Sequence, residues 1–143
     1  MAVSSNGYGA GIGGGNNISC GNIVIKGGHI TATGGSQAAG IGGGESTSCG
    51  NITISGGIIE ATGGQSAVGI GSGSSQNNTS TCAGITIVNT TTKLQSTAGT
   101  GSTYNFGASN GGTCGTITIA GTVRDQSEND FNADKHATFY WYP

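Results

Sequence analysis

Charged side chains are scarce in this 143-residue sequence, which contains four Lys and Arg residues, six Asp and Glu residues and a formal net charge of −2. A surface that binds nucleic acid or an anionic membrane needs clustered positive charge, so we expect no nucleic-acid partner. The sequence also lacks an apolar run near the ~20 residues that a membrane helix requires. We therefore expect no insertion into a membrane.

A secretion signal is absent as well, because the first residues, MAVSSNGYGA, have neither a basic start nor an apolar centre. The stretch YGAGIGGG, which begins at Tyr8, matches only the end of the repeat unit described below. Both features are expected of an excised piece of a larger secreted protein.

Proline occurs once, whereas glycine supplies 31 residues. Collagen-like fibres are as rich in glycine but place it at every third position, and that period is missing here. Ile, Val and Thr instead recur in short alternating runs, and each run is followed by a glycine pair. Such runs favour strands, and glycine pairs allow the chain to turn. The length fits one domain.

The sequence repeats itself at intervals of about 30 residues. Cysteines stand at positions 20, 49, 82 and 114, at spacings of 29, 33 and 32 residues, and the motif GIG(G/S)G begins at Gly11, Gly40 and Gly69. The extra residues of the two longer intervals fall in SSQNNTST and TAGTGSTYN, which are typical of loops. A repeat at a fixed period indicates stacked structural units.

Each unit opens with a strand of the form C-x-x-I-(V/T)-I. The residue between the two isoleucines is Val24, Thr53, Thr86 or Thr118, so apolar and polar positions alternate as in a half-buried strand. If the units stack in register, equivalent residues lie about 4.8 Å apart and form ladders. The expected ladder residues are Cys20, Cys49, Cys82 and Cys114, then Ile23, Ile52, Ile85 and Ile117, then Ile25, Ile54, Ile87 and Ile119.

Two further strands follow in each unit, separated by glycine corners. In HITATGG and IIEATGG, the inward residues would be Ile30 with Ala32 and Ile59 with Ala61. In AAGIGGG and AVGIGSG, they would be Ala39 with Ile41 and Val68 with Ile70. Three short strands per unit predict an all-β fold, a three-sided right-handed parallel β-helix of about four coils.

The predicted coils start near residues 20, 49, 82 and 114 and belong to a repeat region spanning residues 1–123, with a non-repeat cap at 124–143. A two-sheet β-sandwich with accidental similarity between hairpins is one alternative. A disordered glycine-rich segment or a bundle of polyglycine helices is another. The isoleucine ladders favour the β-helix over both.

The motifs GNITISGG, ATGG and GAGIGGG resemble the glycine-rich repeats of large bacterial secreted and cell-surface proteins of the pectate-lyase-like right-handed β-helix class. The resemblance is close over residues 8–73, weaker over 82–123 and absent from 124–143. It implies an extracellular or cell-surface location and contact with carbohydrate or a host surface protein. It also implies a scaffold without a defined active site.

The four cysteines are expected to form one column. Neighbours about 4.8 Å apart are within disulfide range, so Cys20 with Cys49 and Cys82 with Cys114 are feasible pairs. A column of buried free thiols is an equal alternative. The cysteines lack the spacing of a metal site, and His29 and His136 stand in different contexts, so no metal or other cofactor is expected.

From Arg124 the repeat stops, and acidic and aromatic residues gather. One interpretation is a cap that covers the last coil with a charged loop and a final aromatic strand. Another is a ligand site, in which aromatic rings stack on sugars and carboxylates accept hydroxyl hydrogen bonds. Calcium binding is a third, although DQSEND lacks the EF-hand pattern. The candidate ligand-binding residues are Tyr140, Trp141, Tyr142, Asp130 and Asp134.

Three functional classes remain open. The first is a non-catalytic surface or adhesion module. The second is an ice-binding solenoid, but the T-A-T face at Thr31–Thr33 becomes E-A-T at 60–62 and then T-K-L around Lys93, which interrupts it, while Thr53, Thr86 and Thr118 form a single column. The third is a fragment of a polysaccharide-active enzyme.

Catalysis on polysaccharides would need carboxylates that converge on one face. The charged residues of the repeats are expected to be scattered, so we predict no enzymatic activity. These residues are Lys26, Glu45, Glu60 and Lys93.

Overall fold

The computed structural model describes residues 1–3, 7–88, 91–102, 104–120 and 139–142. Its described residues contain strands and no helix. The strands are β1 (Ala2–Val3), β2 (Ile12–Gly13), β3 (Ile23–Ile25), β4 (His29–Thr33), β5 (Ile41–Gly42), β6 (Ser48–Ile54), β7 (Gly57–Thr62), β8 (Ile70–Gly71), β9 (Ser80–Ile87), β10 (Thr91–Thr97), β11 (Phe106–Gly107), β12 (Gly112–Cys114), β13 (Ile117–Ala120) and β14 (Phe139–Tyr142).

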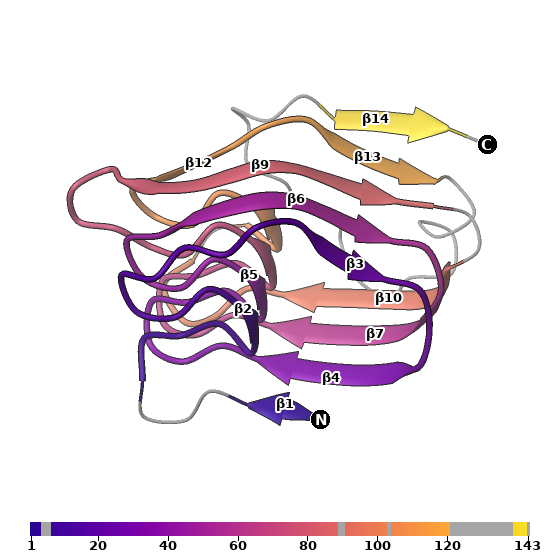
Figure 1. Ribbon diagram of the computed structural model, residues 1–143, viewed down its shortest axis with the longest axis horizontal. Helices are drawn as coiled ribbons and strands as arrows, with labels where there is room; N and C mark the ends of the chain where they lie inside the picture. Colours follow the sequence, from indigo (N-terminus) through magenta and orange to yellow (C-terminus); the bar gives the residue numbers. More distant parts are fainter. Residues whose placement is uncertain (4–6, 89–90, 103, 121–138, 143) are drawn as a thin grey trace.

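These strands form three sheets (Figure 1). The first sheet has the order β1-β4-β7-β10, the second β2-β5-β8-β11 and the third β3-β6-β9-β13-β14, with β12 also paired to β9. All strand pairs within the sheets are parallel, and each joins one coil to the next. The chain is therefore an all-β, three-sided parallel β-solenoid, as predicted, and the β-sandwich and disordered alternatives are wrong.

About three turns are present in the described part of the chain. The coils β3-β4-β5, β6-β7-β8 and β9-β10-β11 each have all three sides. Before them come β1 and β2, and after them β12 and β13, which form the first side of the coil predicted to start near residue 114. Of the loop-like stretch SSQNNTST, residues 74–79 lie between β8 and β9, and the last two residues belong to β9; of TAGTGSTYN, residues 98–102 follow β10.

The interior consists of the predicted isoleucine ladders. Ile52 pairs with Ile23 on one side and with Ile85 on the other, and Ile85 pairs with Ile117. Because inward positions of successive coils lie directly above one another, each apolar side chain is covered by its equivalents. The fully buried members are Ile52, Ile54, Ile85, Ile87, Ile117 and Ile119, joined from the other two sheets by Ala32, Ile41, Ile59, Ile70, Leu94 and Phe106. Ala39 and Val68, just before β5 and β8, are also fully buried but lie outside this core cluster.

A column of glycines lines the second sheet, where Gly42 pairs with Gly13 and Gly71, and Gly71 pairs with Gly107. Gly42 and Gly71 have φ angles of 133° and 143°, a region that side chains rarely adopt. A Cβ atom on either residue would also overlap the carbonyl oxygen of the next glycine in the column. The repeat therefore requires glycine here for two independent reasons.

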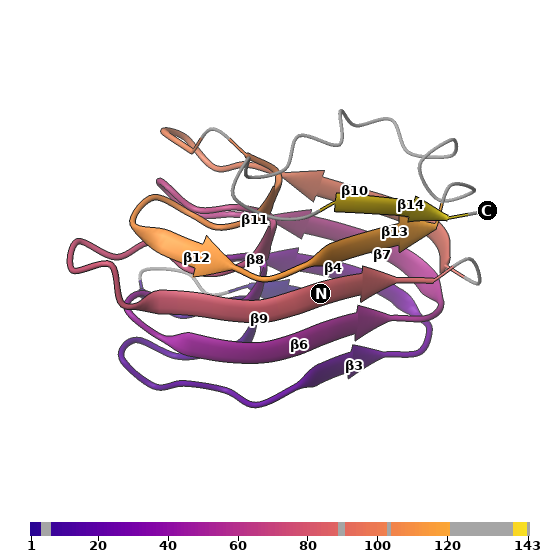
Figure 2. The same ribbon diagram turned by 90° about the horizontal axis from the view of Figure 1, so that it is seen from above.

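The strand β14 continues the third sheet beyond β13, as Figure 2 shows from above. Its backbone pairs in parallel register, with Ile117 opposite Phe139 and Ala120 opposite Tyr142. Residues 124–138, which make up most of the predicted cap, lie outside the described residues.

Candidate binding face and cysteine column

The outward residues of β4, β7 and β10 form a mainly polar face on the first sheet, in which Ile58 is the apolar member. They stand in three columns, because His29 is in register with Ile58 and Lys93, Thr31 with Glu60 and Gln95, and Thr33 with Thr62 and Thr97. The strands that carry them lie side by side (Figure 1). We call this surface the polar face; its polar members are His29, Thr31, Thr33, Glu60, Thr62, Lys93, Gln95 and Thr97, and Ile58 lies between His29 and Lys93.

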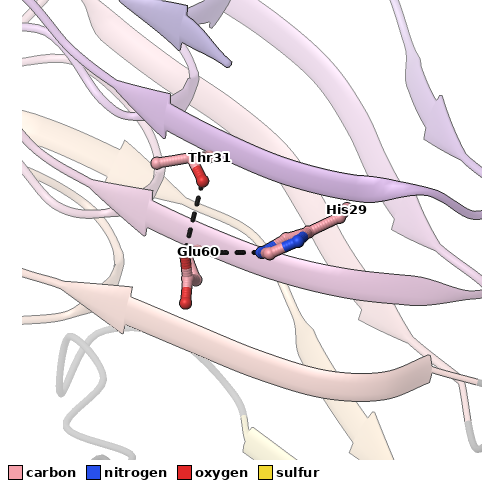
Figure 3. A network of polar contacts seen from close by, with 3 residues as sticks. All are labelled: His29, Thr31 and Glu60. Atoms are coloured by element: carbon pink, nitrogen blue, oxygen red, sulfur yellow. Dashed lines mark hydrogen bonds and ion pairs between the residues drawn. The ribbon is translucent and has the colours of Figure 1, made fainter.

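The carboxylate of Glu60 is the centre of a small network on this face (Figure 3). The Thr31 hydroxyl donates a hydrogen bond of 3.2 Å to Oε2 of Glu60, and Nε2 of His29 lies 3.7 Å from the same oxygen. The His29 side chain is 66% exposed and that of Glu60 is 38% exposed. Since exposed ion pairs contribute little stability, the network orients the carboxylate outward rather than holding the fold together.

Replacement of Glu60 by glutamine is accordingly expected to change the free energy of unfolding by less than about 0.5 kcal/mol. Glutamine keeps an oxygen that can accept the Thr31 hydrogen bond, and it removes only the charge. Urea denaturation of the two proteins measures the difference. A loss above about 1 kcal/mol would show that the network stabilises the fold.

The predicted alignment of the third coil on this face is wrong. Aligning T-K-L with E-A-T sets Thr92 opposite Glu60, and a constant offset from the cysteines would set Lys93 there. The structure instead places Gln95 opposite Glu60 and Lys93 opposite Ile58. The corner before β10 is one residue longer than the equivalent corner before β7, and a bulge between Thr91 and Lys93 adds another. The face therefore continues as Q-S-T, and its threonine column extends through Thr33, Thr62 and Thr97.

Two of the four charged residues predicted to be scattered share this face. Lys93 and Glu60 lie on adjacent strands of it, while Lys26 follows β3 and Glu45 follows β5. Sequence reasoning did not find His29 and Gln95 as members. The signal for His29 was present, because it stands two positions before Thr31, as Ile58 does before Glu60.

On the outer side of the third sheet, Val24, Thr53, Thr86 and Thr118 form one column in register. On this outer surface, at the position between the two isoleucine ladders, the threonine hydroxyls form one column. It provides a matched surface for comparison with the polar face.

The four cysteines lie in one column at the edge of the core. Cys82 is in register with Cys49 and with Cys114, and the Cys20 thiol donates a hydrogen bond to Sγ of Cys49 at 3.4 Å. All four are free thiols. Cys49 and Cys82 are 4% and 3% exposed, whereas Cys20 and Cys114 at the two ends are partly exposed.

The ionisation of Cys20, Cys49 and Cys82 is suppressed. Burial raises the pKa of Cys20 to about 12, chiefly by removing water from the thiolate. The side-chain hydrogen bond to Cys82 raises the pKa of Cys49 well above its ordinary value, and the one to Cys114 raises the pKa of Cys82 to about 12. These thiols are protonated at neutral pH.

Stability is therefore expected to fall as the pH rises above about 9. In the unfolded chain the thiols of Cys20 and Cys82 ionise near their ordinary pKa of 9.0, and in the folded chain they ionise only near 12, so the unfolded state is favoured progressively between these values. Cys82 alone contributes up to about 1.4 kcal/mol per pH unit. Denaturation midpoints measured from pH 8 to 11 should decline less steeply in Cys82→Ala, and equal slopes would contradict this assignment.

The aromatic candidates Tyr140, Trp141 and Tyr142 lie in β14, with their backbone in register with Thr118, Ile119 and Ala120. Asp130 and Asp134, the acidic candidates, lie outside the described residues. The polar face belongs to the first sheet, whereas β14 belongs to the third, so the two candidate ligand surfaces are on different sheets.

Within the described ranges, the surface contains no detected pocket, and no group of three or more His, Cys, Asp or Glu side chains converges as metal ligands do. The same part of the chain contains no helix long and apolar enough to cross a membrane.

Comparison with known families matches two segments, residues 23–45 and 52–74, to a family model described as a beta helix repeat. Each segment starts in a ladder strand of the third sheet and ends just after the second sheet, so each corresponds to one coil of the structure. Two coils of this β-solenoid therefore match the beta helix repeat family. No curated protein and no solved structure matches this β-helix.

Proposed function

We propose that this β-helix is a non-catalytic module of a bacterial secreted or cell-surface protein, and that it presents its polar face to carbohydrate or to a protein on a host surface. The extracellular, bacterial setting is inferred from the resemblance of the GNITISGG, ATGG and GAGIGGG motifs. The observation that carries the binding role is the polar face, which combines hydroxyls, an amide, a carboxylate, an imidazole and an ammonium group on three adjacent strands.

The arrangement of these groups suits a ligand rich in hydroxyls. Polar side chains repeat about every 4.8 Å from coil to coil and about every 6.6 Å along a strand. Hydroxyl and amide groups both donate and accept hydrogen bonds, as sugar hydroxyls do. Because the inward neighbours Ile59, Ala61 and Leu94 are fully buried, the strands are held rigidly. Binding therefore costs the protein little conformational entropy.

The test is a screen of the purified protein against immobilised bacterial and host glycans, followed by titration of each hit. The variant T31A/E60Q/Q95A removes the central column of the polar face. The control T53A/T86A removes hydroxyls from the third sheet instead. We expect at least about tenfold weaker binding for the first variant, which corresponds to about 1.4 kcal/mol, and unchanged binding for the control.

Equal loss in both variants, or no glycan hit at all, would contradict binding through the polar face. A further arm tests the alternative ligand site in the C-terminal segment, where Trp141→Ala should leave glycan binding unchanged if the polar face is responsible. Thermal-shift measurements with and without calcium accompany this arm. A loss restricted to Trp141→Ala would assign the site to Tyr140, Trp141, Tyr142, Asp130 and Asp134.

Ice binding is a second candidate, favoured by one observation. The column of Thr33, Thr62 and Thr97 is continuous across three coils, so hydroxyls and methyl groups repeat at the strand spacing. Glu60 and Lys93 lie within the same face, and charged groups are strongly hydrated. A thermal-hysteresis measurement tests this candidate, and hysteresis that disappears in a Thr62→Glu variant would favour it over carbohydrate binding.

A further inference from the structure

We propose that the cysteine column is a binding site for soft monovalent metal ions of the Cu(I) class, with one ion held between Cys20 and Cys49 and a second between Cys82 and Cys114. The proposal is independent of the polar face. It rests on the number and alignment of the free thiols and on the geometry of the column.

The ligand chemistry selects the class of ion. Thiolate sulfur is a soft ligand that prefers ions such as Cu(I), and the column contains four free thiols in successive coils. The cysteines follow one another in register from coil to coil, so a point between neighbouring thiols is adjacent to two sulfurs. Two-coordinate, linear binding is common for Cu(I) and Ag(I), whereas structural zinc requires four ligands in a tetrahedron.

The spacing of the coils matches such a site. With the zinc–sulfur bond length of about 2.3 Å as a guide, two metal–sulfur bonds in line span about 4.6 Å, close to the ~4.8 Å between equivalent residues of adjacent strands. The sulfurs of Cys20 and Cys49 are now 3.4 Å apart in a thiol–thiol hydrogen bond. Small side-chain rotations would open this distance to the required span while the strands keep their register.

With two sites of two adjacent cysteines each, every sulfur belongs to one site, and each site can be reached from the solvent. Cys20 and Cys114 are partly exposed, and their partners Cys49 and Cys82 are buried. An ion can therefore bind first to the accessible thiol at either end and then to its buried neighbour. Each ion forms two metal–sulfur bonds and displaces two thiol protons to the solvent, which leaves one net negative charge on each two-thiolate complex.

The experiment is an anaerobic titration of the reduced full chain with Cu(I) supplied as its bicinchoninate complex, whose absorbance reports the copper that the protein removes. The wild-type protein is expected to take up about two ions per chain. Assay of all four thiols in denaturant before the titration establishes that the column is reduced. Zn(II) added in place of Cu(I) is expected to bind at least about 100-fold more weakly, because two sulfurs in line do not form its tetrahedron.

Two double variants with equal numbers of thiols provide the matched comparison. C20S/C49S keeps the adjacent pair Cys82 and Cys114 and should bind about one ion, whereas C49S/C82S keeps only the two ends of the column, about 14 Å apart, and should bind none. Equal binding by the two variants would overturn the proposal, since adjacency would then be irrelevant. Circular dichroism checks that both variants fold.

X-ray absorption of the copper-loaded wild-type protein supplies a test that needs no variant. Two sulfur neighbours per copper and no nitrogen or oxygen neighbour are expected. Three or more neighbours per copper would contradict linear sites between successive coils.

Discussion

Replacing Gly42 by alanine is expected to lower the free energy of unfolding by at least about 3 kcal/mol. The φ angle of 133° at this position is unfavourable for alanine, at a cost of about 1–3 kcal/mol. The new Cβ would also overlap the carbonyl oxygen of Gly71 in the next coil. That oxygen belongs to backbone, which cannot rotate away, so the two coils would have to separate locally and weaken their hydrogen bonds.

A matched control for this substitution is Gly21→Ala. A Cβ on Gly21 would have no neighbouring atom within 4 Å, and Gly21 is not among the glycines with positive φ. Its replacement is expected to alter the free energy of unfolding by less than about 1 kcal/mol, because alanine fits this position and reduces the freedom of the unfolded chain. Guanidinium denaturation measures both variants. Similar midpoints for Gly42→Ala and Gly21→Ala would show that the glycine column does not control the close approach of the coils.

Truncation of Ile85 to alanine is expected to cost about 2–5 kcal/mol. Ile85 is fully buried, and its in-register neighbours Ile52 and Ile117 are fully buried as well. The substitution leaves a cavity in the middle of the ladder, and the coils above and below cannot collapse into it without breaking register. The change should appear as a lower denaturation midpoint.

The control is Thr86→Ala, one residue further along the same strand on the outer side, with an expected change below about 1 kcal/mol. Ile85→Val should fall between the two, at about 0.5–1.5 kcal/mol. A different order among the three variants would contradict the assignment of this ladder to the core. Hydrogen exchange adds a spatial readout, since each coil of a solenoid contacts only its neighbours and the loss of protection should be largest around β6, β9 and β13.

The sequence predicts the ladders well because the same spacing recurs in every unit. Ile23 and Ile25 stand at the same distances after Cys20 as Ile117 and Ile119 do after Cys114. A strand so close to the cysteine tolerates no insertion without moving its apolar residues to the wrong side. The alternation of isoleucine and threonine therefore predicts both the strand and the direction of its side chains.

The second strand of the third coil could not be aligned in this way. Two residues are added between Ile87 and Lys93, one at a corner and one in a bulge, and the composition of TTKL does not reveal where they lie. Only pairing between strands decides that Gln95 lies opposite Glu60. The membership of the polar face depends on this register, and so does the continuity of its threonine column.

By itself, the sequence determined the parallel stacking of repeat units, the isoleucine interior and the single column of cysteines, because these follow from identical residues at constant local spacing. The tertiary structure alone decided which polar residues share a face, which atoms of His29, Thr31 and Glu60 meet, and which cysteines are buried or partly exposed. The physical reason is that these properties depend on contacts between coils. Each residue inserted at a corner or in a bulge can change which residues are paired between neighbouring strands. The repeat spacing in the sequence does not show at which position an inserted residue shifts this register.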